Sequence, residues 1–231
     1  LSLIDYSFPT ADLINARDIV VFITLICIIY LSSNRGNSYL LITILGFLSI
    51  FSLFWSLDRG LVCNLLIIIS LIYFLAIKDL KKTISILLSL LIFWIITFLL
   101  FNDEFIYFIK NSLIVISEMS YIHGVIFPKP FSDDPDSSRA AKNLLVLIFT
   151  VLIMVNLYIK NNKFPHSLKF ILLLVLATSF LSLIYIFGRS DGPHIKNIFG
   201  FSIIFIGIFL FFYVLKIIDD RFKNNLNRRN I

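Results

Sequence analysis

The segment "GRSDGPHIKN" (188–197) brings Arg189, Asp191 and His194 into six consecutive positions of an otherwise apolar region. An arginine can hold an anionic group, and a carboxylate or an imidazole can take a proton from a reacting hydroxyl. The plain alternative is an ion pair between Arg189 and Asp191 beside a solvated His194. The segment is a candidate site, and both interpretations stay open.

A second charged group stands in "FWSLDRG" (54–60), where Asp58 and Arg59 separate two apolar runs. One interpretation is a tight turn with a helix-ending Gly60, a local pair between Asp58 and Arg59, and Trp55 as an interfacial anchor. The other is that Asp58 or Arg59 points into a cavity between helices, where ionisable groups mark substrate paths.

The longest interruption of the apolar pattern is the segment 102–142. Residues 105–117 have the character of an amphipathic helix that lies in the membrane interface, with two acids, Asp103 and Glu104, at its positive N-terminus. The aromatic stretch "YIHGVIFPKPF" then carries His123 and Lys129, which are further candidates for substrate binding. The whole segment could cap a site or dock a partner.

Three acids, Asp133, Asp134 and Asp136, follow in "SDDPDSS". Their oxygens would suit a divalent cation, but acids around a proline are more typical of a solvated turn. Cys27 and Cys63 lie inside apolar runs and form no metal motif or disulfide framework. We therefore expect no metal and no cofactor.

The composition decides the fold class. The chain has 231 residues, of which 59% are hydrophobic and 15% charged, and its mean hydropathy is +0.96. A soluble domain is about 25% charged. Long apolar runs are typical of membrane-spanning helices, so we predict an all-α, polytopic transmembrane helical bundle with about seven spans plus the interfacial amphipathic helix. The expected spans are 19–31, 39–57, 61–77, 83–101, 143–159, 170–187 and 198–215.

The distribution of charge predicts the orientation. The connections around Arg35, 78–82 and 160–169, with the tail 216–230, hold 12 of the 20 Lys and Arg residues and 3 of the 14 acids. The positive-inside rule places this side, and therefore the C-terminus, in the cytoplasm. Both candidate segments and the 102–142 loop then share the outer face. The basic balance is a topology signal, so no nucleic-acid partner is expected.

Three parts of the chain follow from this orientation. Residues 1–18 form an outer juxtamembrane segment, 19–217 a transmembrane domain that includes the outer loop 102–142, and 218–231 a basic cytoplasmic tail. The first residue is Leu, which we interpret as the start of a fragment or a processed product.

"FWSLDRG" and "GRSDGPH" resemble polar signatures of the C-type glycosyltransferase superfamily, whose members are large polytopic proteins of the bacterial inner membrane that use polyprenyl-phosphate sugars. The resemblance covers these two motifs and the topology. That superfamily usually has more spans, and its key acid lies in the first outer loop, after a first span. No span precedes residue 19 here; were one lost, Asp5, Asp12 or Asp18 would become candidates.

The resemblance implies transfer of a sugar from a lipid-phosphate donor to an acceptor on the outer face of the bacterial inner (plasma) membrane. In that reaction Asp58 or Asp191 would be the base, and Arg59, Arg189 or His194 would hold the phosphate. The partners would be the lipid bilayer and a lipid-linked sugar.

Two other classes remain open. A transporter or flippase of a lipid-linked or anionic solute would need polar groups deep in the spans, where the sequence offers scattered Ser, Thr and Asn and no acid. A non-catalytic membrane subunit would use the outer loop only to dock a partner.

Overall fold

The computed structural model describes residues 16–33, 38–123, 135–160, 164–188 and 192–229. These residues form seven α-helices, preceded by the 3-10 turn η1 (Ala16–Asp18), and contain no strand. The helices are α2 (Ile19–Ser33), α3 (Tyr39–Trp55), α4 (Leu57–Ala76), α5 (Leu80–His123), α6 (Pro135–Lys160), α7 (His166–Gly188) and α8 (Gly192–Arg229). The all-α bundle predicted from the apolar runs is confirmed.

The lengths of the helices suit a membrane. Four described segments are long and apolar enough to cross it by length and composition, namely Leu57–Ala76, Leu80–Val115, Ala141–Ile159 and Gly200–Asp219. Three shorter segments are also apolar, namely Ile19–Ser33, Tyr39–Trp55 and His166–Ser182. Apart from their first and last turns, helices satisfy the backbone N–H and C=O groups within one segment, as lipid requires. The chain therefore has the helices of an integral membrane protein.

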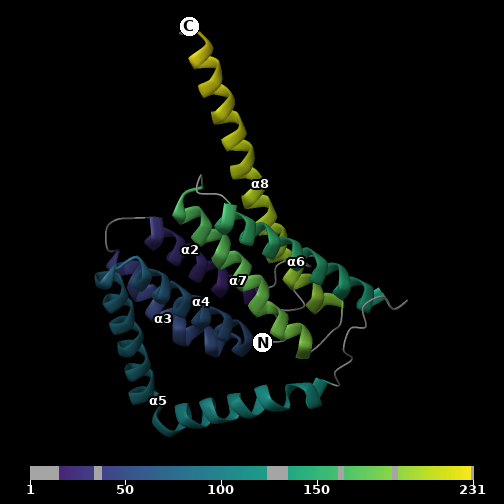
Figure 1. Ribbon diagram of the computed structural model, residues 1–231. Helices are drawn as coiled ribbons and strands as arrows, with labels where there is room; N and C mark the ends of the chain where they lie inside the picture. Colours follow the sequence, from purple (N-terminus) through teal and green to yellow (C-terminus); the bar gives the residue numbers. More distant parts are fainter. Residues whose placement is uncertain (1–15, 34–37, 124–134, 161–163, 189–191, 230–231) are drawn as a thin grey trace.

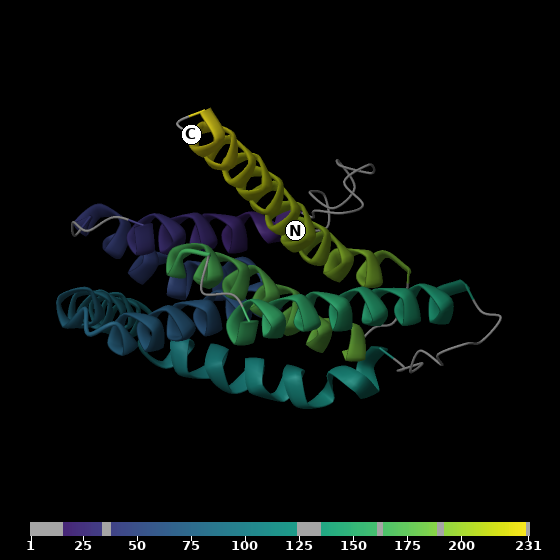
Figure 2. The same ribbon diagram turned by 45° about the horizontal axis from the view of Figure 1, so that its top comes forward.

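The helices pack in two neighbouring groups (Figures 1 and 2). In the first, α2, α3 and α4 contact one another around a core that includes Ile28, Leu45 and Leu66. In the second, α6, α7 and α8 surround Leu157, Leu172 and other buried side chains. Helix α7 also contacts α2 and α4, so it joins the two groups.

Helix α5 consists of two arms (Figure 1). Asn102 breaks the helix with φ 42° and ψ −116°, and the chain bends sharply there. The first arm packs mainly along α3, and large apolar side chains on its other faces, such as Leu91 and Leu99, are exposed as a lipid-facing surface would be. The second arm contains the predicted helix 105–117 and continues to His123.

Small and polar residues let α3 approach its neighbours closely. A Cβ atom at Gly46 would collide with Ser89 of α5, whose hydroxyl donates a hydrogen bond to the Ile42 carbonyl. The indole of Trp94 donates to the Ser49 hydroxyl, and Asn64 of α4 donates to the Ser49 carbonyl at 2.8 Å. Such contacts hold helices together in lipid, where the hydrophobic effect supplies no driving force between them.

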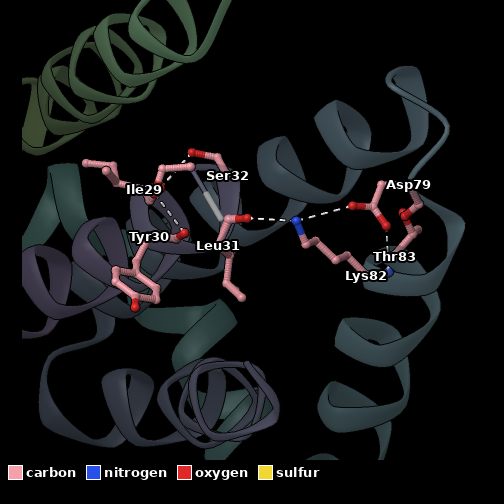
Figure 3. A network of polar contacts seen from close by, with 8 residues as sticks. Ile29, Tyr30, Leu31, Ser32, Asp79, Lys82 and Thr83 are labelled. Carbon is pink, nitrogen blue, oxygen red and sulfur yellow. Dashed lines mark hydrogen bonds and ion pairs between the residues drawn. The ribbon is translucent and has the colours of Figure 1, made fainter. Parts of the chain in front are cut away.

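A buried lysine ties α2 to the connection between α4 and α5 (Figure 3). Lys82 is only 4% exposed, and its ammonium donates to the Leu31 carbonyl at 2.9 Å and pairs with Asp79 at 3.2 Å. The ammonium thereby satisfies an orphan carbonyl in the last turn of α2. It also lies 5.5 Å from the centre of the Phe74 ring.

Three boundaries differ from those expected. Helix α4 begins at Leu57, so "LDRG" is its first turn and Gly60 does not end a helix; the reversal from α3 needs only Ser56. Helix α6 begins at Pro135, so the second half of "SDDPDSS" is helical and the expected solvated turn is wrong there, while Asp133 and Asp134 lie outside the described residues. Helix α8 begins at Gly192 and includes most of the basic tail.

Candidate functional site

The N-termini of α2 and α4 bring together two charges that are distant in the sequence. Asp18 is the last residue of η1 and directly precedes α2, while Arg59 lies in the first turn of α4. Helices α2 and α4 pack against each other, so these two first turns meet. A carboxylate is favoured at the positive end of a helix, whereas an arginine there is disfavoured unless an acid compensates it.

Asp18 provides that compensation. The Nε of Arg59 lies 2.7 Å from the Oδ1 of Asp18, and the two side chains are 3% and 1% exposed. A buried charge that lacks a partner is very costly, so this ion pair is a condition of burying either residue. The local pair predicted between Asp58 and Arg59 is the weaker one, with 3.8 Å between Arg59 Nε and Asp58 Oδ2. Of these two acids, Asp18 is therefore the closer partner of Arg59.

Asp58 has a different environment from Asp18. Its Oδ1 accepts a hydrogen bond from the Ser56 hydroxyl, which orients the carboxylate. Its Oδ2 is buried and has no hydrogen-bond partner among the described residues, although the side chain as a whole is 20% exposed. The carboxylate is thus oriented, partly accessible and still able to accept a hydrogen bond.

Trp55 supplies a free donor on the same hairpin. It ends α3, one residue before Ser56, and its ring stacks on Phe51 with 5.8 Å between ring centres. The indole N–H is buried and, within the described ranges, has no acceptor. Among the described residues, the Trp55 N–H and the Asp58 Oδ2, which flank Ser56, and the Ser52 hydroxyl of α3 are buried polar groups without a hydrogen-bond partner. The N–H can donate a hydrogen bond and the carboxylate oxygen can accept one.

Small polar groups extend the site towards the interior. The thiol of Cys63, one turn after Arg59, lies beside the hydroxyls of Thr24 and Ser52. The Thr24 hydroxyl donates to the Val20 carbonyl at 2.8 Å. Cys27 and Cys63 are both buried and free, so they form no disulfide. No group of three His, Cys, Asp or Glu side chains gathers within the described part of the chain.

Of the residues selected from the sequence, the structure brings Asp58 and Arg59 into this site. Arg189, Asp191 and Lys129 lie outside the described residues. His123 is the last residue of α5, and His194 lies in the first turn of α8, which begins after the predicted break between α7 and α8. Only their backbone is described, so their side chains are not assigned to the site.

Asp18 is the residue that sequence reasoning missed as the partner of Arg59. The sequence alone makes Asp18 a candidate only as part of an outer loop, and it lies just outside the predicted span 19–31. The available signal was an arginine inside an apolar helix, which needs an acid, and Asp18 stands immediately before the first span.

Comparison of the chain with protein-family models, with curated proteins and with solved structures found no match.

Proposed function

We propose that the chain forms part of a glycosyltransferase of the bacterial inner membrane, which moves a sugar from a lipid-phosphate donor to an acceptor hydroxyl on the outer face. The observation that carries the proposal is that two buried groups of the α3–α4 hairpin, the indole N–H of Trp55 and the Oδ2 of Asp58, have no hydrogen-bond partner among the described residues. An acceptor hydroxyl would receive a hydrogen bond from Trp55 and donate one to Asp58. A carboxylate placed in this way is a suitable general base.

The step would proceed as follows. The acceptor oxygen forms a bond to the anomeric carbon of the sugar as its proton passes to Asp58. The bond between that carbon and the phosphate oxygen breaks, and the lipid phosphate leaves with the bonding electrons. A cation near the leaving phosphate would lower the barrier.

The ion pair with Asp18 changes the role proposed for Arg59. Because Asp18 holds its guanidinium at 2.7 Å, Arg59 serves to fix the first turn of α4 and the orientation of Asp58. The phosphate then needs another cation. Arg189 and His194, in the segment between the apolar parts of α7 and α8, are the candidates that the sequence provides.

The test is transfer by the purified chain in liposomes that contain a labelled polyprenyl-phosphate sugar and an acceptor glycan. We expect Asp58→Asn to lose at least 100-fold in transfer, the usual contribution of a general base. Asp219→Asn is the matched control, because it makes the same change at an exposed position of α8. Trp55→Phe should raise the KM for the acceptor more than it lowers kcat.

The outcomes separate the proposal from its alternatives. Wild-type transfer by Asp58→Asn, with unfolding temperatures of both variants unchanged, would overturn the assignment. A buried ion pair such as Asp18–Arg59 is also compatible with a transporter, since ionisable groups between helices often line solute paths. Movement of the labelled lipid across the bilayer without transfer would favour that class, and neither activity would favour a non-catalytic subunit.

A further inference from the structure

Lys169 is a buried cation that pairs with no acid in the described part of the chain. The residue is 5% exposed and lies close to the N-terminus of α7. Among the described residues no carboxylate pairs with it, and its ammonium lies 5.6 Å from the centre of the Tyr158 ring of α6. A cation–π contact compensates only part of the cost of burying an ammonium group.

The position in the helix adds to this cost. The N-terminus of a helix is positive, so a lysine there is disfavoured and an acid is favoured. The first turn of α7 contains no acid. The connection 160–169 has Lys160, Lys163 and Lys169 and no acidic residue at all. Neither the first turn of α7 nor the connection 160–169 therefore supplies a negative charge to balance the ammonium of Lys169.

Lys82 shows how the same fold compensates a buried lysine when it acts only in structure. Lys82 is as buried as Lys169, but its ammonium donates a hydrogen bond to the Leu31 carbonyl and forms an ion pair with the Asp79 carboxylate (Figure 3). Lys169 has neither kind of partner among the described residues. The described part of the chain thus compensates Lys82 and leaves Lys169 able to bind a further anion.

The neighbours of Lys169 are suited to a phosphate. The phenols of Tyr73 and Tyr158 lie within electrostatic reach of one another, and the Tyr73 ring stacks on Phe170 with 3.6 Å between ring centres. Two phenolic O–H groups and one ammonium provide several donors from α4, α6 and α7. Lys216 of α8, whose ammonium lies 4.6 Å from the centre of the Phe164 ring, adds a second cation at this end of the bundle.

The surroundings favour a lipid as the source of that phosphate. Tyr158 is 52% exposed on a helix whose outer surface is apolar, including Leu152 and Ile159. An acyl chain can lie along such a surface while its headgroup reaches the end of the helices. This end also belongs to the side that the positive-inside rule assigns to the cytoplasm, where anionic lipids meet basic residues.

We propose that Lys169, Tyr158 and Tyr73 form a binding site for the phosphate of an anionic phospholipid in the leaflet on the basic side of the membrane. The site lies at the end of α4 opposite to Arg59, and it is independent of the proposed transferase activity. Its occupant would compensate Lys169 and join α4, α6 and α7.

Native mass spectrometry of the full chain in detergent micelles tests this proposal, with phosphatidylglycerol, phosphatidylcholine or inorganic phosphate as the added probe. We expect phosphatidylglycerol to bind at least tenfold more tightly than phosphatidylcholine. Lys169→Gln should weaken that binding by roughly tenfold, the loss expected from one hydrogen bond to a charged group. Lys169→Arg should retain it.

Lys81→Gln is the matched control, because Lys81 is an exposed lysine on the same side of the membrane. It should bind phosphatidylglycerol within twofold of the wild type. The unfolding temperature of Lys169→Gln in phosphatidylcholine shows whether the variant folds, and Lys169→Arg gives a second, charge-preserving measurement.

Four results would overturn the proposal: equal binding of the two lipids, unchanged binding by a folded Lys169→Gln variant, an equal loss in Lys81→Gln, or full displacement of the lipid by millimolar inorganic phosphate. The third would indicate attraction to the general basic charge, and the fourth a site for a free anion.

Discussion

Arg59 Nε and Asp18 Oδ1 lie 2.7 Å apart, and this ion pair fastens the start of α2 to the start of α4. Both side chains are almost completely buried. Asp58, the residue before Arg59 in α4, lies 3.8 Å from Arg59 Nε through its Oδ2, and this oxygen has no hydrogen-bond partner within the described structure. The ion pair thus links the two helices, while Asp58 keeps the accepting oxygen that the proposed general base requires.

Asp18→Asn should destabilise the protein strongly. The asparagine has nearly the same shape, but it leaves the guanidinium of Arg59 buried without its main counter-charge. Loss of one partner of a buried pair costs about 3–5 kcal/mol, so we expect a decrease of that order in the free energy of unfolding. Unfolding by sodium dodecyl sulfate in mixed micelles, followed by circular dichroism, measures it.

The double variant Asp18→Asn/Arg59→Gln provides the control. Because it removes both charges, it should be more stable than Asp18→Asn alone, and the difference gives the coupling between the two residues. Additive losses from the two single substitutions would show that the ion pair is not what stabilises this end of the bundle.

The bundle itself could be predicted from the sequence because lipid imposes a simple rule on the chain. Apolar runs of sufficient length must be helical, and the expected spans overlap all seven observed helices. The separation of α7 from α8 was also predicted, from Gly188, Gly192 and Pro193; α7 is described to Gly188 and α8 from Gly192, so Gly192 and Pro193 begin α8.

The pairing of Asp18 with Arg59 could not be predicted in the same way. It depends on which helices lie side by side, and apolar runs carry little information about that. Asp58 and Arg59 also suggest a connection between two spans, because charged residues usually lie outside the membrane. In the structure Ser56 alone, with φ −164° and ψ 117°, reverses the chain, and Asp58 and Arg59 lie inside α4. The break of α5 at Asn102 could not be predicted either, because no proline or glycine lies near it in the sequence.

Gly60→Ala should disrupt the α3–α4 hairpin. A Cβ atom at Gly60 would lie 2.6 Å from the backbone N and Cα of Leu53, closer than real contacts allow. Because backbone atoms cannot move aside as a side chain can, we expect a loss of roughly 1–3 kcal/mol in the free energy of unfolding, typical of overpacking.

Gly207→Ala is the matched substitution in α8, where a Cβ atom would meet nothing within 4 Å. It should leave stability unchanged or raise it slightly, because alanine favours the helix. Equal unfolding curves for the Gly60→Ala and Gly207→Ala variants would contradict the close approach of α3 and α4.

Lys82→Met should weaken the junction of α2, α4 and α5. The substitution leaves the Leu31 carbonyl without its donor and Asp79 without its ion pair. We expect a loss of about 1–3 kcal/mol, the cost of leaving a buried polar group unsatisfied. Lys81→Met, at an exposed neighbouring position, should change the unfolding curve little. Comparable losses in both variants would show that general charge, rather than the contact with Leu31, is responsible.

Lys78→Gly should stabilise the protein. Lys78 follows the C-terminus of α4 with φ 62°, in the left-handed region that a side chain disfavours. The N–H of Lys78 donates to the Leu75 carbonyl, and the N–H of Asp79 donates to the Phe74 carbonyl at 2.8 Å, which is the hydrogen-bond pattern of a Schellman motif. Glycine is the usual residue at this position of the motif.

We expect Lys78→Gly to raise the free energy of unfolding by about 1 kcal/mol, since the strain relieved exceeds the extra chain entropy of glycine. Equilibrium unfolding in mixed micelles checks the sign. Lys81→Gly removes the same charge inside the helical first turn of α5, where glycine is unfavourable, and it should lower stability by about the same amount. A loss of stability in Lys78→Gly would mean that the lysine side chain contributes more at the end of α4 than its backbone strain costs.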